Sequence, residues 1–294
     1  MRIGFAGIGR MGEPMAMRLL QANFPLVVWN RTPERLAAIT AAGARAAATP
    51  RELAVESDAV LTMVTDDAAV NSVYLGGDGL LSASVKGKLF ADMSTILPAT
   101  VASIASAVFD RGASFVDAPV AGTVQPARDG RLLIFAGGPA EDVERLKPVF
   151  NVLARRVDHL GPVGSGAAMK LVHNALLSTY WAVFAEAMAM GSRYGLDLKR
   201  MLDVISESPA NFAALGVKTP LLLGQTSEVG FNIANVRKDL NAIVRFAEST
   251  GVPLPIVHAA LAKYEQAIAD GHALEDVAAM VSLSRRERVP RSGG

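Results

Sequence analysis

Three glycines follow a short apolar strand at the start of this chain, and their spacing constrains the fold more than any other feature. The run Ile3–Ala6 leads directly into Gly7, Gly9 and Gly12. In a dinucleotide-binding turn, these positions allow a tight turn, a close backbone approach to a pyrophosphate, and close packing of the next helix. That helix then points its N-terminus at the phosphates. We therefore expect a dinucleotide to contact Gly7, Ile8, Gly9, Arg10, Met11 and Gly12.

The residues after the second predicted strand indicate which dinucleotide is bound. An acidic residue is common there and bonds the adenosine ribose, but this chain has Asn30, Arg31 and Thr32 after Leu26–Trp29. A guanidinium, an amide and a hydroxyl suit a 2′-phosphate, which a carboxylate would repel. The sequence thus favours NADP over NAD. The alternative is that Asn30 and Thr32 cap a helix beginning near Pro33 while Arg31 is solvated.

The composition narrows the class of protein. At 294 residues, the chain is long enough for two domains, and its net charge of +1 gives no electrostatic reason to expect nucleic acid or an anionic membrane. It has no cysteine, and its four histidines lack metal-ligand spacing, so we expect no metal. The apolar run 171–191 contains polar residues, so we interpret it as a buried helix and not as a membrane span. The N-terminus resembles neither a secretory leader nor a transit peptide, and we expect a cytoplasmic protein.

The order of strand and helix signals predicts an α/β fold. Residues 1–162 should form a Rossmann-type doubly wound sheet, residues 163–283 an all-α domain entered through a long interdomain helix, and residues 284–294 a flexible tail. The expected strands are 3–6, 26–29, 60–64, 89–92, 115–117 and 132–136. The expected helices are 35–42, 52–57, 100–109, 167–194, 199–206, 235–249, 256–270 and 275–283.

The segment 167–194 is apolar almost all round. A helix of that kind must be buried between domains or between subunits. We therefore expect a homodimer or homotetramer.

Lys170 and Asn174 are the candidate catalytic pair. A lysine one turn into an apolar helix is costly unless it faces a cleft or a partner, and burial lowers a lysine pKa toward the working range of an acid–base catalyst. Asn174 lies four residues later, on the same helix face, where both side chains could hold one substrate oxygen. Spacing alone equally allows a lysine that extends to solvent beside a capping asparagine.

Five motifs occur in order over residues 1–283: Gly7-Ile-Gly-Arg-Met-Gly-Glu-Pro-Met-Ala16, Asp92-Met-Ser-Thr-Ile-Leu-Pro98, Asp117-Ala-Pro-Val120, Gly164-Ser-Gly-Ala-Ala-Met-Lys170 and Lys238-Asp239. In these motifs the chain resembles the β-hydroxyacid dehydrogenase family, which includes 3-hydroxyisobutyrate dehydrogenase and the tartronate, glyoxylate and succinic semialdehyde reductases.

The resemblance implies reversible, NADPH-dependent reduction of a small aldehyde acid to a hydroxy acid. It implies that Lys170 is catalytic and that Asn174 orients the substrate. Thr95 would lie against the nicotinamide, and Lys238 would reach the active site with support from Asp239. The residues implied to contact the cofactor also include Met63, Val64, Phe231, Lys238 and Asp239, and those implied to contact the substrate include Ser94, Ala121, Gly122, Thr123 and Lys238.

Two departures from the family pattern bear on the substrate. Ala121 stands where relatives usually have a serine that bonds the substrate carboxylate, so either Thr123 and backbone amides replace that donor or the substrate differs. The threonine and proline of this segment resemble the glyoxylate and succinic semialdehyde reductase branch. His173 stands where an asparagine is common, and we interpret it as a packed helix residue or an added substrate contact. Pocket volume would depend on side chains such as Phe231, Asn211 and Trp181.

Other functions remain open from the sequence. Imine reduction is one, because Ala121 loosens the carboxylate site, although Lys170 argues against it. A non-catalytic dinucleotide-binding module is another, and Lys170 argues against that as well. A phosphogluconate dehydrogenase shares the early motifs, but its helical domain is usually longer.

Overall fold

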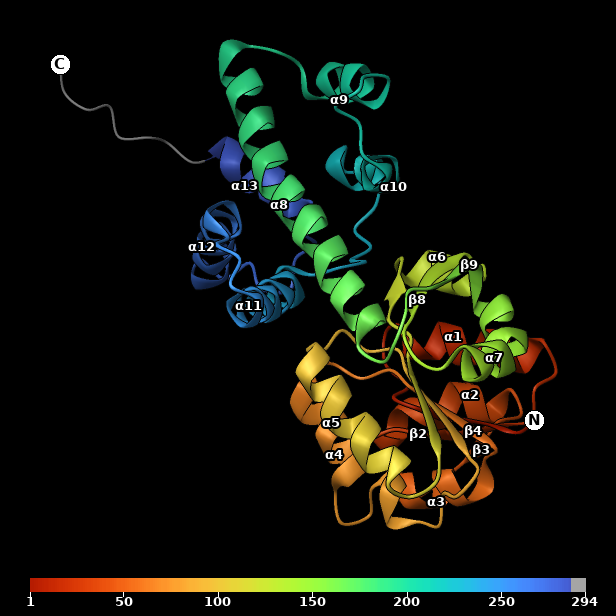
Figure 1. The fold of residues 1–294 in the computed structure, drawn as a ribbon. Helices are drawn as coiled ribbons and strands as arrows, with labels where there is room; N and C mark the ends of the chain where they lie inside the picture. Colours follow the sequence, from red (N-terminus) through yellow and green to blue (C-terminus); the bar gives the residue numbers. More distant parts are fainter. Residues whose placement is uncertain (287–294) are drawn as a thin grey trace. The chain divides into compact units, whose positions relative to one another are not determined.

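The chain folds into two compact units, which we describe separately. The computed structural model describes residues 1–286 (Figure 1). The first unit comprises residues 1–172 and the second begins at His173. The division falls within one continuous helix, α8 (Ser165–Tyr194).

A six-stranded sheet forms the centre of the first unit. Its strand order is β3-β2-β1-β4-β5-β6, and every neighbouring pair is parallel. The strands are β1 (Ile3–Ala6), β2 (Leu26–Trp29), β3 (Arg45–Ala46), β4 (Ala59–Thr62), β5 (Leu89–Asp92) and β6 (Ser114–Asp117). The order reverses direction between β1 and β4, which is where doubly wound folds bind their ligands. The expected doubly wound sheet is confirmed.

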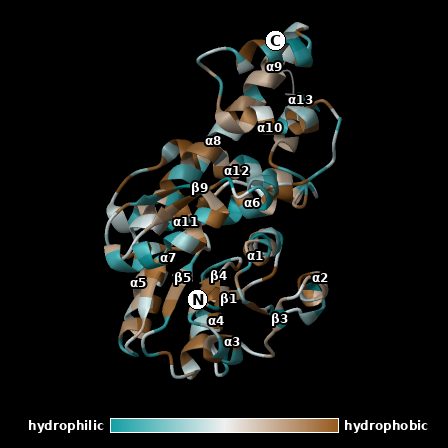
Figure 2. Ribbon diagram, turned by 90° about the vertical axis from the view of Figure 1, so that its right-hand side faces the viewer, coloured by the Kyte–Doolittle hydropathy of each residue, from teal (hydrophilic) through white to brown (hydrophobic). Residues whose placement is uncertain are grey.

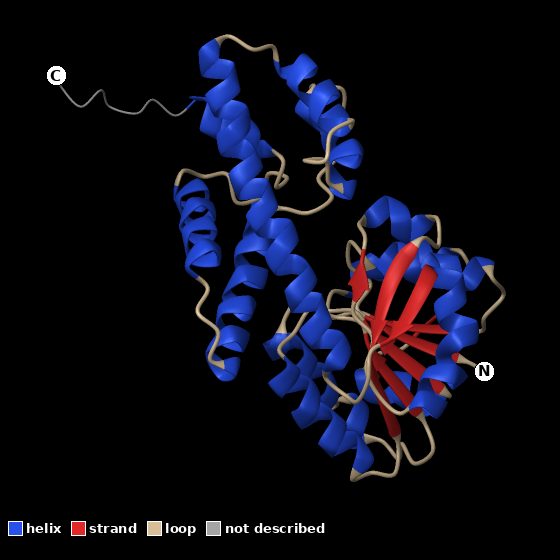
Figure 3. Cartoon of the chain, turned by 45° about the horizontal axis from the view of Figure 1, so that its top comes forward, coloured by secondary structure: helices blue, strands red, loops and turns tan. Residues whose placement is uncertain are grey.

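Two hydrophobic clusters cover the two faces of this sheet. Because β1, β4 and β5 are buried on both faces, their side chains alternate between the clusters. Helices α1 (Gly12–Gln21), α2 (Ala37–Ala41) and α7 (Ala140–Leu153) contribute to one cluster, and α3 (Pro50–Glu56), α4 (Asp67–Leu75) and α5 (Pro98–Phe109) to the other. Figure 3 shows helices on both sides of the strands, and Figure 2 shows hydrophobic ribbon at β1 and β4.

A second, three-stranded sheet corrects one strand prediction. Residues 132–136 form a strand as expected, β8 (Leu132–Ala136), but it pairs antiparallel with β7 (Val120–Ala121) and parallel with β9 (Ala154–His159), outside the six-stranded sheet. Its apolar run looks like another buried parallel strand, so periodicity could not separate the two cases. The charged sequence of β9 gave no strand signal. The strand expected at 60–64 ends at Thr62, so Met63 and Val64 lie in the loop beyond it.

The second unit is helical, as expected. It contains the rest of α8 with α9 (Leu198–Ser206), α10 (Ala213–Leu222), α11 (Ile233–Thr250), α12 (Pro255–Ala269) and α13 (Ala279–Arg286). Helix α10 was not predicted, because Gly216 and Pro220 weaken its helical signal. The last helix begins at Ala279 and not at Glu275, since Asp276 forms a β-bridge with Asn232. Most of the predicted tail, from residue 287 onward, lies outside the described residues.

Helix α8 is only partly buried within one chain. Trp181 is 1% exposed and packs edge-on against Phe184 and Phe212, so it is a core residue and was wrongly considered as a pocket residue. In contrast, Leu176, Val183 and Met190 are 72%, 53% and 73% exposed and recur every seven residues along one face. The expectation that every face is buried is therefore not met inside a single chain. None of the helices within residues 1–286 has the length and apolarity needed to span a membrane.

Candidate functional site

The predicted cofactor residues of the first unit follow the carboxyl ends of its parallel strands. Gly7 follows β1, Asn30 follows β2, Met63 follows β4 and Ser94 comes two residues after β5. Parallel strands end at the same edge of a sheet, so the fold brings these loops to one edge at the point where strand order reverses.

The three glycines of the first loop differ in what they require from the fold. Gly7 has φ +102°, and a Cβ there would lie 2.2 Å from the Met63 carbonyl oxygen. A Cβ on Gly12 would lie 1.9 Å from the Gly7 carbonyl oxygen. A Cβ on Gly9 would meet only Nη1 of Arg35, at 3.8 Å. The fold itself therefore excludes side chains at Gly7 and Gly12, whereas the space beside Gly9 is free for a ligand.

The segment Asn30–Thr32 does not use its side chains to cap the next helix. The Asn30 amide donates to the Thr32 carbonyl oxygen at 2.9 Å. Thr32 occupies the N-cap position of the short 3₁₀ helix η1 (Pro33–Leu36), but its hydroxyl makes no hydrogen bond that caps this helix. Arg31 is exposed. The threonine hydroxyl and the guanidinium thus remain accessible to a phosphate, as the NADP interpretation requires.

Ser94 belongs to a buried polar cluster at the ends of β4 and β5. Its hydroxyl accepts a hydrogen bond from the Val64 amide at 3.0 Å, and its own amide donates to Asp92 Oδ1 at 3.0 Å. Asp92 is 1% exposed, and its Oδ2 has no hydrogen-bond partner among residues 1–286. Burial raises the pKa of Asp92 to about 7 against the opposing effect of the Ser94 hydrogen bonds. Ser94 therefore holds the two strand ends together, because its hydroxyl accepts from Val64 and its side chain also hydrogen-bonds Asp92.

A buried carboxylate fixes the start of α8. Asp117 accepts from the Gly164 amide at 2.7 Å and from the Ala167 amide at 2.8 Å. Burial raises the pKa of Asp117, and these amide bonds oppose the shift. A Cβ on Gly166 would lie 2.2 Å from the Phe135 carbonyl oxygen, so the helix begins in tight contact with β8. Lys170, 8% exposed, follows one turn later on this anchored helix.

The segment expected to hold a substrate carboxylate lies at the end of β7. Ala121 is buried there and has no hydroxyl to donate. Gly122 has φ +133°, a conformation in which a larger residue would be strained. Thr123 takes the N-cap position of α6 (Val124–Arg128), but its side chain makes no hydrogen bond that caps this helix. The Thr123 hydroxyl is thus not used by the helix end it precedes.

In the second unit, four polar side chains are linked in a row by two hydrogen bonds and one ion pair. Asn174 Nδ2 donates to Asp239 Oδ2 at 2.7 Å, and Lys238 Nζ lies 2.8 Å from Asp239 Oδ1. Asn174 Oδ1 lies 3.0 Å from His173 Nδ1. A carboxylate can only accept, so the Asn174 amide nitrogen must face Asp239, and the Asn174 amide oxygen then accepts a hydrogen bond from His173 Nδ1. Asn174 is held in one orientation and keeps a second N–H for another partner.

Phe231 lies just before α11, at the end of a connection that begins after α10. Its ring is partly exposed, while its backbone amide donates to Asp276 Oδ2 at 3.1 Å. The Asn211 amide donates to the Ser206 carbonyl oxygen at 2.7 Å and is committed to its own loop.

Two residues at these sites had no signal in the sequence. They are Arg35 beside Gly9 and Asp276, which accepts from the Phe231 amide. Arg35 was placed in a predicted helix without a role, and His173 was divided between packing and substrate contact. A hydrogen bond between Phe231 and Asp276 joins residues 45 positions apart, a separation that no local pattern reveals.

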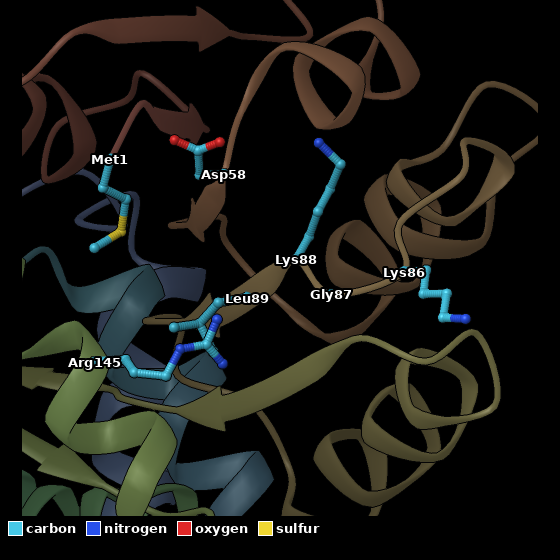
Figure 4. Close-up of a pocket in the computed structure, with 7 residues that line it drawn as sticks. All are labelled: Met1, Asp58, Lys86, Gly87, Lys88, Leu89 and Arg145. Atoms are coloured by element: carbon cyan, nitrogen blue, oxygen red, sulfur yellow. The ribbon is translucent and has the colours of Figure 1, made fainter.

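A cavity of about 450 Å³ in the first unit lies at the other edge of the sheet (Figure 4). It is lined by residues that precede β1, β4 and β5, including Met1, Asp58 and Lys88. Lys88 Nζ donates to the carbonyl oxygens of Val55 and Ser57, so this ammonium group has a structural role. The cavity does not contain the predicted site residues. No group of three metal-ligating side chains occurs within residues 1–286.

Two family models together match nearly the whole chain. The NAD-binding domain of 6-phosphogluconate dehydrogenase matches residues 2–161, and the NAD-binding domain of NADP-dependent 3-hydroxyisobutyrate dehydrogenase matches residues 164–284.

Individual relatives agree with these matches. The chain is 32% identical to glyoxylate/succinic semialdehyde reductase 2 of Arabidopsis thaliana, covering 95% of this chain and 78% of the relative. It is also 32% identical to 2-(hydroxymethyl)glutarate dehydrogenase of Eubacterium barkeri, covering 100% and 98%. A solved 3-hydroxyisobutyrate dehydrogenase of Mycobacterium tuberculosis with L-serine superimposes with a TM-score of 0.87 at 27% identity, covering 97% and 99%.

Imine reductases are more distant. A solved imine reductase from Pseudomonas sp. has 22% identity and a TM-score of 0.65 over 96% of this chain and 98% of that chain. At this identity, the similarity shows a shared fold and carries no argument for imine reduction.

Proposed function

Because this chain is a member of the β-hydroxyacid dehydrogenase family, and thus an NAD(P)-dependent hydroxyacid dehydrogenase, we propose that it reversibly reduces a small aldehyde acid with NADPH. The observation that carries the proposal is the pairing of Lys170 and Asn174 one turn apart on α8. Both side chains are buried, and the Asn174 amide has its orientation fixed. A semialdehyde or glyoxylate is the substrate class that we expect.

The first unit would hold the dinucleotide. The free space beside Gly9 would admit the pyrophosphate, and the amides at the start of α1 would face its charge. Arg31 and Thr32 would bind the 2′-phosphate of NADP, and Arg35 would add a second cation beside the glycine turn. Met63, Val64 and Thr95, at the ends of β4 and β5, would lie along the nicotinamide half. The bound dinucleotide would supply the hydride.

Lys170 would transfer the proton, and Asn174 would hold the substrate oxygen in place. Protonated Lys170 polarises the substrate carbonyl and donates a proton to the oxygen as negative charge develops on it. The second N–H of Asn174 fixes that oxygen, because its first N–H is engaged by Asp239. In the oxidation direction, neutral Lys170 accepts the hydroxyl proton of the hydroxy acid.

The substrate carboxylate would be bound by Thr123, the backbone at Gly122, and Lys238. Ala121 supplies no hydroxyl bond, and the loss of one donor to a carboxylate costs about 1 to 3 kcal/mol of binding. We propose that Thr123 replaces this donor, since its hydroxyl is not used as a helix cap.

We also propose that a second copy of the chain covers the exposed face of α8. Leu176, Val183 and Met190 form an apolar stripe, which soluble proteins rarely leave in water. Light scattering coupled to size-exclusion chromatography should report a dimer or tetramer. Substitution of Leu176 and Val183 by aspartate should then yield monomers, and a wild-type monomer would contradict this part of the proposal.

The test of the function is a panel of initial rates. NADPH and NADH oxidation would be followed with glyoxylate, succinic, tartronate and methylmalonate semialdehydes, for wild type, Lys170→Ala and Lys199→Ala. Lys199 is an exposed lysine on α9 paired with Asp203 and serves as the matched control. We expect NADPH-preferring turnover that falls by about 10² to 10⁴ in Lys170→Ala and is unchanged in Lys199→Ala.

Two results would contradict the proposal. Wild-type turnover in Lys170→Ala would remove the lysine from the mechanism. Dinucleotide binding without reduction of any aldehyde acid would favour a cyclic imine substrate or a non-catalytic module, and rates measured with a cyclic imine separate those two.

A further inference from the structure

Asp276 is a buried carboxylate of the second unit that the proposed chemistry does not use. It is 3% exposed. Its Oδ2 accepts from Lys218 Nζ at 2.5 Å, from the Gly230 amide at 2.9 Å and from the Phe231 amide at 3.1 Å. Its Oδ1 accepts from the Ala278 amide at 3.1 Å. One cation and three amides thus converge on one carboxylate, which offsets the cost of burying it.

These bonds hold two distant segments together as a short antiparallel pair. The Val277 amide donates to the Phe231 carbonyl oxygen at 2.8 Å, and the Ile233 amide donates to the Glu275 carbonyl oxygen at 2.9 Å. Asn232 and Asp276 form an isolated antiparallel bridge between them. Both backbone polar groups of Phe231 are therefore bonded to residues 276–277, so its backbone is fixed on both sides.

The same pairing sets the start of α11. Asn232 forms the N-cap of α11, and its side-chain oxygen accepts from the Asn235 amide at 2.9 Å. Lys238 and Asp239 follow on the second turn of that helix. The Asp276 cluster, defined as Asp276 with Lys218, Gly230 and Phe231, thus fixes the segment that leads into α11.

We propose that Asp276, with Lys218, is a positioning residue that preorganises Phe231 for the dinucleotide. The inference rests on the proposed function and on the cofactor contact that the family resemblance implies for Phe231. Phe231 is partly exposed and belongs to a connection, and both of its backbone polar groups are hydrogen-bonded to residues 276–277. Without the carboxylate, the segment has to be ordered when the dinucleotide binds, and that cost appears as weaker affinity.

The inference predicts a change in binding and not in chemistry. Asn174 is oriented by His173 and Asp239, and those bonds do not involve Asp276. Loss of the cluster should therefore raise the Kd for NADPH and leave the turnover number at saturating cofactor nearly unchanged.

The experiment compares Asp276→Asn with wild type and with Asp203→Asn. Asp203 pairs with Lys199 on the exposed face of α9 and provides a matched control in the same unit. Hydrogen exchange would be measured over residues 229–233, and NADPH affinity by fluorescence titration. In Asp276→Asn, we expect hydrogen exchange of that segment to be about tenfold faster and the Kd for NADPH to be about five- to tenfold higher. The turnover number should stay within about twofold of wild type. Asp203→Asn should change none of these.

A second variant keeps the inference testable if the first does not fold. If Asp276→Asn leaves Lys218 buried without its charge partner and does not fold, the double variant Lys218→Met/Asp276→Asn removes both charges and is measured in the same way. Exchange at wild-type rates in a folded variant would overturn the inference, and so would faster exchange with an unchanged Kd. A wild-type protein that binds neither dinucleotide would overturn the proposed function, and this inference with it, before any variant is compared.

Discussion

The two units contribute different kinds of groups to the proposed site. In the first unit, the site is made mostly of backbone: strand ends, glycines without side chains and the amides of a helix start. In the second unit it is made of side chains, because Asn174, Asp239 and Lys238 reach one another through hydrogen bonds and an ion pair. In the proposed site, the first unit therefore contributes mainly backbone groups together with Lys170, and the second contributes side chains oriented by one another.

The largest effect should come from breaking the backbone-built part. In Gly12→Ala, the new Cβ would fall 1.9 Å from a carbonyl oxygen, so the turn must move, and we expect a loss of about 4 kcal/mol in the free energy of unfolding. In Gly9→Ala the new methyl group meets only the end of Arg35, and stability should change by less than about 1 kcal/mol. Urea unfolding of both variants checks this, and equal destabilisation would show that the two glycines serve the same purpose.

Asp92 sharpens the comparison, because it is a buried side chain within the backbone-built unit. Its folded pKa of about 7 lies above the ordinary carboxyl value of 3.8, so the folded chain retains a proton that the unfolded chain releases between these pH values. Stability therefore falls as pH rises from about 4 to about 7 and stays lower above that range. Asp92→Asn, which is always neutral, should gain about 2 to 4 kcal/mol over wild type at pH 8 and almost nothing at pH 4.

Urea unfolding at the two pH values measures this difference. Tyr74→Phe is a suitable control, because Tyr74 faces the same cluster and burial raises its pKa, so it is neutral at both pH values. An equal gain from Asp92→Asn at pH 4 and pH 8 would show that Asp92 does not titrate between them.

The smallest expected effect concerns Arg31, a side chain of the first unit that would favour NADP over NAD. Arg31→Ala should weaken NADPH binding by about 2 kcal/mol, through loss of a charge-assisted bond to the 2′-phosphate, and leave NADH binding unchanged. Arg155→Ala, an exposed arginine on β9, is the control. Equal weakening for both dinucleotides would place Arg31 away from the 2′-phosphate and remove the reason for preferring NADP.

The strands of the backbone-built part could be predicted from the sequence, whereas the contacts among the side chains of the second unit could not, for physical reasons. The strand before Gly7 and the strands at 26–29 and 89–92 have local apolar patterns, so they were found with their boundaries. The bond between Asn174 and Asp239 joins residues 65 positions apart, and no periodicity reveals such a contact. Residues 132–136 were correctly predicted as a strand, yet their place in the smaller sheet depends on β7 and β9, which are too short or too charged to predict.

The same contrast explains which site residues emerged only from the structure. Lys170 was found because a charge in an apolar helix is conspicuous in the sequence. Asp276 lies in a segment predicted to be helical, where a carboxylate is ordinary, and its importance depends on four hydrogen bonds from separate segments.

The central claim is that the glycine turn binds the dinucleotide while Lys170 moves the proton, and one paired measurement tests it. The Kd for NADPH and the single-turnover reduction rate at saturating NADPH would be determined for Gly9→Ala and Lys170→Ala. We predict that Gly9→Ala raises the Kd about tenfold or more with a nearly unchanged rate, and that Lys170→Ala lowers the rate by about 10² or more with a nearly unchanged Kd. If both variants change the same quantity, binding and proton transfer are not divided in this way.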